Sequence, residues 1–273
     1  MSFFRSTAIA AAFAFAVLTG GCGSSPSPSK APVFIKPANQ DAIERLMQPA
    51  TAATRQEGIA AAILLDTSGS MKDAVQGADR KPKPKIKVAQ DALLNLLQQF
   101  SAFGQKHPET KLLVGIYDFS ARKGQPSCRE VVRLGPLDLA AAQGAIKNIQ
   151  PEGATPIGDA MITAKRDLDA TGFSHRHILV ITDGENNIGY LPGDVTKVIA
   201  GEPDSGRAAI YFIAFDIGAE VFDPVKDAGG LVLAAESEQQ LADTLDFILT
   251  GKILVEQPPS PTPMQHPPIG IRK

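Results

Sequence analysis

Three stretches of this chain are apolar at almost every position, and they constrain its fold more than any other feature. They cover residues 59–65, 177–182 and 208–215. A strand with one face in water alternates between apolar and polar residues, so these runs indicate strands that are buried on both faces. Apolar residues at helical spacing, as in residues 88–103, lie between them. This alternation predicts an α/β fold with a doubly wound, mostly parallel sheet, helices on both faces and one antiparallel edge strand.

Weaker patterns complete this outline. They predict further strands at 112–117, 131–134 and 231–234, and helices at 40–47, 139–149, 157–168, 222–227 and 238–249.

The first residues have the composition of an export signal. Arg5 precedes an apolar run over residues 8–18, and small residues follow it. A run of this length is too short for a bilayer core, which needs about 20 residues. A basic start, a short apolar stretch and small residues are typical of a cleaved signal peptide, which we assign to residues 1–21.

The end of this signal resembles the bacterial lipobox, in which a Cys becomes the lipidated first residue of the mature chain. Cys22 is that residue here, although Thr19 stands where Leu is usual. The alternative is ordinary signal-peptidase cleavage with Cys22 as a plain thiol. Acylation of Cys22 leaves Cys128 without an intrachain partner. Gly23, rather than Asp, follows the Cys. In a Gram-negative bacterium this resembles sorting to the outer membrane, facing the periplasm or the cell surface.

The positions of the prolines divide the rest of the chain into a tether, a domain and a tail. Ten of the 21 prolines lie near its two ends, so we expect a tether with one short helix at 22–57, a folded domain at 58–253 and a disordered Pro-rich tail at 254–273. A formal charge of -2 argues against a nucleic-acid partner. The basic stretch 79–87 is interpreted as a solvated loop, with a patch for an anionic surface as the alternative.

Polar residues follow two of the buried strands. D-T-S-G-S begins at Asp66, directly after the first run, and D-G-E begins at Asp183, directly after the second. Between them, the loop G-A-T-P-I-G-D-A contains Thr155. Ligands of parallel sheets bind beyond the carboxyl ends of the strands, so these three segments are the candidate site.

Together the three segments resemble the von Willebrand factor A (VWA) family over residues 58–250. The metal-ion-dependent adhesion site (MIDAS) of that family uses a D-x-S-x-S loop, a Thr from a second loop and an Asp from a third. The matching positions in this chain are Asp66, Ser68, Ser70, Thr155 and Asp183.

The chemistry of these residues agrees with what the resemblance implies. Hydroxyl and carboxylate oxygens suit a hard cation, so we expect Mg²⁺, or another divalent cation such as Mn²⁺ or Ca²⁺. In the family the hydroxyls usually contact the metal, whereas the carboxylates often act through water. Such a metal keeps strong positive character and accepts an Asp or Glu from a partner protein. The competing interpretation of the first loop alone is a Ser-rich turn that caps a helix.

Other polar residues near the strand ends are expected to have structural roles. Asp159 is expected to favour a helix N-terminus or to bond a neighbouring hydroxyl. Asp118 and Asp216 match no metal position of the family and are expected in loops or supporting contacts. The four His residues form no convincing base or ligand set, and no catalytic motif is present, so we do not expect an enzyme.

These expectations define the functional hypotheses. The first is a metal-dependent protein-binding module of a bacterial envelope lipoprotein, attached to the membrane by its lipid anchor and bound to an unidentified partner that offers Asp or Glu. The second is a structural envelope lipoprotein whose metal only stabilises the fold. A role beside an AAA+ ATPase is more remote, because the export signal takes the chain away from ATP.

Overall fold

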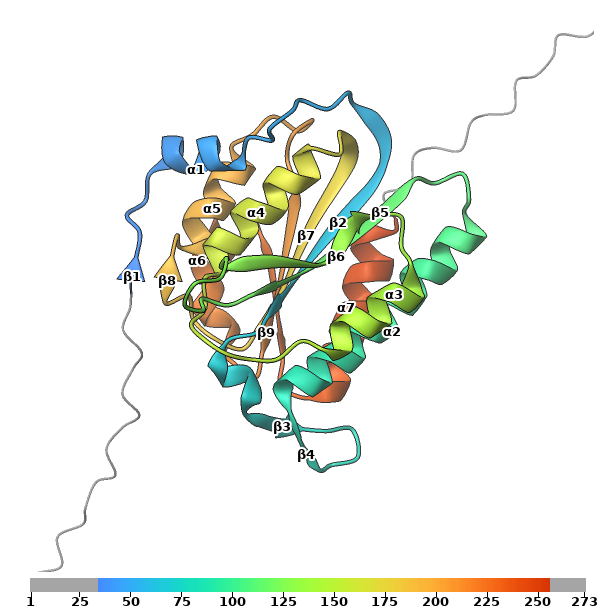
Figure 1. Ribbon diagram of the computed structural model, residues 1–273, viewed down its shortest axis with the longest axis vertical. Helices are drawn as coiled ribbons and strands as arrows, with labels where there is room; N and C mark the ends of the chain where they lie inside the picture. Colours follow the sequence, from blue (N-terminus) through green and yellow to red (C-terminus); the bar gives the residue numbers. More distant parts are fainter. Residues whose placement is uncertain (1–33, 256–273) are drawn as a thin grey trace, which may run out of the picture. The chain divides into compact units, whose positions relative to one another are not determined.

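The structure is a computed structural model that describes residues 34–255. Its centre is a six-stranded sheet with the strand order β10-β9-β7-β2-β5-β6 (Figure 1). All neighbouring pairs are parallel except β5 and β6, so β6 is an antiparallel edge strand as predicted. The strands are β2 (Gln56–Asp66), β5 (Leu112–Phe119), β6 (Cys128–Gly135), β7 (Phe173–Thr182), β9 (Ala209–Phe215) and β10 (Leu231–Ala235).

Helices cover both faces of this sheet, which confirms the predicted fold class. One face carries α2 (Lys85–Lys106), α3 (Leu139–Lys147) and α7 (Glu238–Ile248). The other carries α1 (Gln40–Met47), α4 (Ile157–Asp169), α5 (Pro192–Ala200) and α6 (Asp223–Asp227). Single turns of helix lie at Gly69–Lys72 (η1), Ala219–Phe222 (η2) and Leu249–Ile253 (η3).

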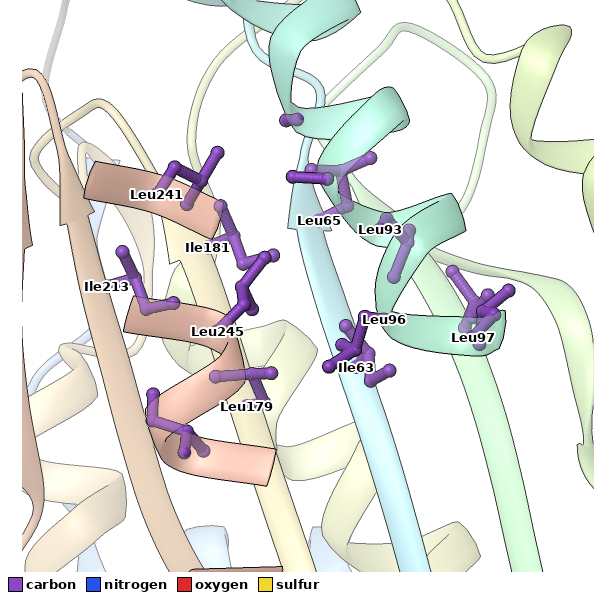
Figure 2. Packing of buried hydrophobic residues seen from close by; sticks show 14 of the residues in the cluster. Ile63, Leu65, Leu93, Leu96, Leu97, Leu179, Ile181, Ile213, Leu241 and Leu245 are labelled. Atoms are coloured by element: carbon purple, nitrogen blue, oxygen red, sulfur yellow. The ribbon is translucent and has the colours of Figure 1, made fainter. Parts of the chain in front are cut away.

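Strand β2 joins the two halves of the core. Ile63 and Leu65 face the α2 and α7 side, and Leu64 faces the α4 side, because successive side chains of a strand point to opposite faces. Figure 2 shows leucines of α2 lying over Ile63 and leucines of α7 lying over β7 and β9. This two-sided burial is the reason for the unbroken apolar run.

The basic stretch 79–87 differs from the solvated loop that we expected. Strand β3 (Ala74–Gln76) pairs antiparallel with β4 (Pro82–Pro84), and α2 begins directly afterwards at Lys85. A two-stranded hairpin tolerates proline because its outer edges need no ladder hydrogen bonds. Lys85 is also buried, whereas a run of alternating Lys and Pro suggested exposure throughout.

A short segment before the domain packs against it. Strand β1 (Phe34–Ile35) pairs parallel with β8 (Ile188–Gly189), and Ile43 and Met47 of α1 are buried in the core. The helix expected within the tether is therefore part of the packed body. Neither β1, β8 nor α5 was expected from the sequence, since two-residue strands carry no periodicity and α5 is short.

The proposed signal peptide, Cys22 and nearly all of the Pro-rich tail lie outside the described residues. Within residues 34–255, no helix has the length and apolar character needed to cross a membrane.

Stability below neutral pH is expected to depend on His177, which is fully buried in β7. Burial, with a smaller contribution from His175, lowers the pKa of His177 to about 3. The unfolded chain takes up a proton near pH 6.5 and the folded chain does not, so the free energy of unfolding falls as pH falls between these values. The loss is about 1.4 kcal/mol per pH unit, or about 2 kcal/mol at pH 5.

Urea denaturation of the wild type and of His177→Gln at pH 7.5 and pH 5 measures this effect. The destabilisation caused by the substitution should shrink by about 2 kcal/mol at the lower pH. A difference between the two proteins that does not change with pH would contradict the assignment.

Candidate metal centre

The three predicted segments meet at the carboxyl edge of the sheet. Asp66 is the last residue of β2, and Asp183 follows β7, the parallel neighbour of β2. Thr155 lies just before α4, whose residues pack on these two strands. The predicted site residues, which come from distant parts of the sequence, are therefore brought together.

Asp66 is fully buried, and both of its carboxylate oxygens are held by the protein. The backbone N–H of Ser68 donates to Oδ1 (2.7 Å), and the hydroxyl of Thr182 donates to Oδ2 (2.6 Å). The first contact shapes the loop after β2, and the second joins β2 to β7. Thr182 was missed in the sequence because it reads as the last residue of an apolar strand.

The two serines form a line of oxygens that ends at the second carboxylate. Ser68 Oγ lies 3.0 Å from Ser70 Oγ, and Ser70 Oγ donates to Asp183 Oδ1 over 2.7 Å. Neighbouring ligands of an octahedral ion with bonds of 2.0–2.1 Å lie about 3.0 Å apart. The spacing of these oxygens thus fits a small hard cation.

Thr155 completes the set from the second loop. Asn187 holds it in place, because its side-chain Oδ1 accepts from Thr155 N (2.8 Å) and its own N–H donates to Thr155 O (3.1 Å). A Cβ at Gly184 would lie 3.5 Å from Thr155 Oγ1 and 3.6 Å from Ser70 Oγ. Gly184 therefore leaves space beside both hydroxyls that a side chain would fill.

Backbone contacts fix the second loop against the first. Gly69 N donates to Gly153 O (3.0 Å), and Glu152 N donates to Thr67 O (2.7 Å). Gly153 has φ +95°, and a Cβ there would lie 2.2 Å from Ala121 O. Only glycine fits this position.

The electrostatics of the site favour an added cation. Burial and then repulsion from Asp183 raise the pKa of Asp66 to about 7. Burial also raises the pKa of Asp183, although Ser70 and Lys85 oppose this effect. Two carboxylates beside three hydroxyls in a confined space form a donor set that suits a divalent cation.

Lys85 is a site residue that the sequence did not reveal. Its Nζ lies 3.1 Å from Asp183 Oδ2 and 2.8 Å from Asp216 Oδ2. Burial alone would lower the pKa of Lys85, but hydrogen bonds and charges from these two aspartates outweigh burial and raise it. Asp216 thus reaches the site indirectly, in agreement with the supporting role expected for it.

The remaining candidates lie around the site. Arg129 forms a salt bridge with Asp118 (2.8 Å), which supports the first loop through Thr67. Asp159 lies in the first turn of α4, as expected, but it contacts Lys36 (3.0 Å) and the backbone N–H of Tyr190 (3.1 Å) instead of a hydroxyl.

Cys128 is the first residue of β6, next to Arg129 and opposite Phe119 of β5. Burial raises the pKa of its thiol to about 12, so the thiol stays protonated at neutral pH.

The described residues include no cluster of three or more His, Cys, Asp or Glu side chains able to hold a metal. The candidate donor set is different, because it combines two carboxylates with three hydroxyls. The residues present fit a hard divalent cation such as Mg²⁺ by the spacing of their oxygens and by the space at Gly184.

A comparison with protein families connects this arrangement to known proteins. Residues 61–185 match the von Willebrand factor type A domain. The matched region begins in β2 and ends two residues after Asp183, so all five candidate ligands lie inside it. A search of curated proteins returned no match.

Solved structures share the fold. The PilB minor pilin from Streptococcus sanguinis superposes with a TM-score of 0.55 at 16% identity, over 76% of this chain and 65% of the pilin. The pilus adhesin SpaC from Lactobacillus rhamnosus GG superposes with a TM-score of 0.53 at 14% identity, over 72% of this chain and 31% of the adhesin. The SpRpn10 VWA domain superposes with a TM-score of 0.51 at 16% identity, over 68% of this chain and 93% of that domain.

At these identities the likeness is one of fold. The chain spans less than two thirds of the pilin and less than a third of the adhesin, whereas it spans nearly all of the SpRpn10 domain.

The contact between Lys85 and Asp183 is expected to be strongly coupled. Their side chains are 8% and 0% exposed, so removal of Lys85 leaves the Asp183 carboxylate buried without a cation, and removal of Asp183 leaves Lys85 with Asp216 alone. In a double-mutant cycle with Lys85→Met and Asp183→Asn, measured by denaturation in EDTA, the coupling energy should be about 2 kcal/mol.

Lys87→Met is the control for this cycle, because Lys87 forms an exposed pair with Asp91. It should change stability by less than about 0.5 kcal/mol. Additive effects of the two buried substitutions would refute the coupling.

Proposed function

We propose that this chain is a metal-dependent protein-binding module that captures an acidic side chain of a partner protein. The observation that carries the proposal is the convergence of Asp66, Ser68, Ser70, Thr155 and Asp183 at one edge of the sheet. The match of residues 61–185 to the VWA domain supports it, because such domains often serve in protein interaction.

The proposed roles follow from what each side chain already does. The hydroxyls of Ser68, Ser70 and Thr155 would hold a divalent cation directly. Asp66 would contribute charge, since both of its oxygens already accept hydrogen bonds from the protein. When bound, the cation supplies a positive centre that accepts a carboxylate from outside.

Asp183 orients this set. It accepts from Ser70 on one oxygen and from Lys85 on the other, so the serine hydroxyl is directed toward the common space. Lys85 balances part of the negative charge and keeps Asp183 in this orientation.

We propose binding without catalysis. Among the described histidines, His107 follows the end of α2, and His175 and His177 lie in the first half of β7, so none of the three lies at the carboxyl edge of the sheet. The described residues therefore offer the hydroxyls no histidine base.

The proposed setting is the bacterial envelope. A signal peptide at 1–21 and lipidation of Cys22 would export the chain and anchor it, with an outer membrane as the expected location. A pilin and a pilus adhesin with the same fold are consistent with a surface role.

Binding of Mg²⁺ should raise the melting temperature of the protein. At a concentration one hundred times the Kd, a ligand of the native state adds about 2.7 kcal/mol of stability. We expect Asp66→Ala and Thr155→Ala to lose this gain in scanning fluorimetry, and to lose Mg²⁺ binding in calorimetry.

Asp73→Ala is the matched control, because Asp73 is an exposed carboxylate at the end of the same loop and outside the donor set. It should retain the response to Mg²⁺. Unchanged Mg²⁺ affinity in Asp66→Ala and Thr155→Ala together would overturn the proposed site.

A partner isolated from native membranes separates the two functional hypotheses. Under the binding hypothesis, EDTA releases the partner. If EDTA lowers the melting temperature and leaves the association intact, the metal is structural and the capture of a carboxylate is excluded.

A further inference from the structure

A rigid hairpin projects from the candidate metal loop. It consists of β3, β4 and the turn at residues 77–81, and we call it the 74–84 hairpin (Figure 1). At its base, Asp73 N donates to Ser70 O and Lys85 N donates to Asp73 O, each over 2.8 Å. The hairpin is thus joined directly to Ser70 and Lys85 of the site.

Glu238, the first residue of α7, holds the hairpin in place. Its Oε2 accepts from Ala78 N (2.6 Å) and from Lys83 Nζ (2.8 Å). Gln76 also forms a bridge with Ser237. These contacts fix the direction in which the turn projects.

The turn and the base of the hairpin carry cations without ionic partners. Lys83, Lys85 and Lys87 form salt bridges with acidic residues of the domain. Lys72, Arg80 and Lys81 are exposed, and the part of the chain that the structure describes gives them no salt bridge. Asp73 and Asp79 of the same segment are also exposed and have no salt bridge there, so residues 72–81 keep a net charge of +1, with Arg80 and Lys81 side by side in the turn.

Arg80 occupies an unfavourable backbone conformation. Its φ is +62°, in the left-handed region that favours glycine, at a cost of about 1 kcal/mol. Glycine would relieve this strain and lose the guanidinium. Arg80 lies in the turn of the hairpin, where its exposed side chain can contact a ligand.

Two exposed glutamates lie near the site on the side of the sheet that α5 and α6 cover. Glu185, which lies two residues after Asp183, and Glu220, which lies in η2 after β9, are both exposed. A negatively charged ligand at the metal loop is thus repelled on this side and attracted on the hairpin side.

We propose that the 74–84 hairpin is a second contact for an acidic segment of the partner protein, so that one carboxylate meets the metal and others meet Arg80, Lys81 and Lys72. This inference rests on the proposed function and specifies the partner as a protein with a cluster of acidic residues. The three residues of β3 separate the base of the hairpin from its turn by about 10 Å, a length that an extended ligand spans with about three residues.

A protein partner fits the hairpin better than a lipid surface. The large hydrophobic residues exposed in the described chain are Phe34, Leu46, Leu191, Phe247 and Val255, all of which lie outside the hairpin. Three cations without an apolar anchor give only weak attraction to an anionic membrane, at about 1 kcal/mol each.

Fluorescence anisotropy with two labelled peptides tests the proposal. The first has a central Asp and, three residues away on each side, a run of three Glu; the second has Gln in place of every Glu. In Mg²⁺, we expect the wild type to prefer the Glu peptide by about fivefold. The double variant Arg80→Gln and Lys81→Gln should lose this preference and keep its Mg²⁺ affinity.

Two further variants separate charge from folding. Arg55→Gln with Lys106→Gln removes the same two charges at the other edge of the sheet, where both residues are exposed, and should keep the preference. Arg80→Gly relieves the strained backbone, so it should weaken Glu-peptide binding without lowering the melting temperature.

The outcomes distinguish this proposal from the one it rests on. Equal affinity of the wild type for both peptides, with Mg²⁺ binding intact, overturns the hairpin contact and leaves the metal site standing. Absence of Mg²⁺ binding overturns the proposed function itself. A Glu preference that is unchanged in EDTA overturns the two-point contact. Hairpin-dependent binding to phosphatidylglycerol vesicles without a Glu-peptide preference assigns the surface to a membrane instead.

Discussion

The site depends on one buried carboxylate. Asp66 is fully buried at the end of the central strand, where an unsatisfied charge would be costly. Its two oxygens are satisfied by Ser68 N and by Thr182 Oγ1, so the same residue that shapes the first loop also links β2 to β7. Because β7 leads into Asp183, the distance between the two carboxylates is set by the pairing of two parallel strands. The site is therefore as rigid as the centre of the sheet.

The charged residues around Asp66 are linked through shared contacts. Asp183 is shared between Ser70 and Lys85, and Lys85 is shared with Asp216, which is more exposed. One lysine thus serves two aspartates, while Asp66 has no cation of its own among these contacts. Negative charge remains at the loop, whereas the hairpin that begins four residues after Ser70 has the exposed cations Arg80 and Lys81 in its turn. A cation bound at the loop and an acidic segment bound at the hairpin would complement this distribution of charge.

Much of the fold and of the donor set could be predicted, because both leave a periodic or ordered record in the sequence. Strands buried on both faces produce apolar runs, and the polar residues after them must meet at one edge of a parallel sheet. Lys85 could not be predicted, because its burial depends on where α2 begins and which aspartates it meets, and the neighbouring Lys and Pro residues resemble a solvated loop. Asn187 and β1 also escaped prediction, since each acts through only a few hydrogen bonds between distant segments.

The pairing of β1 with β8 determines how a pulling force would pass through the molecule. Phe34 N donates to Asn187 O and Lys36 N to Gly189 O, each over 2.9 Å, and Asn187 in turn holds Thr155. Tension between the backbone at residue 34 and a ligand at the hydroxyls runs along this short line of contacts, with Lys36 and Asp159 beside it. The six-stranded sheet lies outside that line. Mechanical resistance in this direction therefore begins with a few hydrogen bonds beside the site, and α1, whose Ile43 and Met47 are buried in the core, takes up the load after they break.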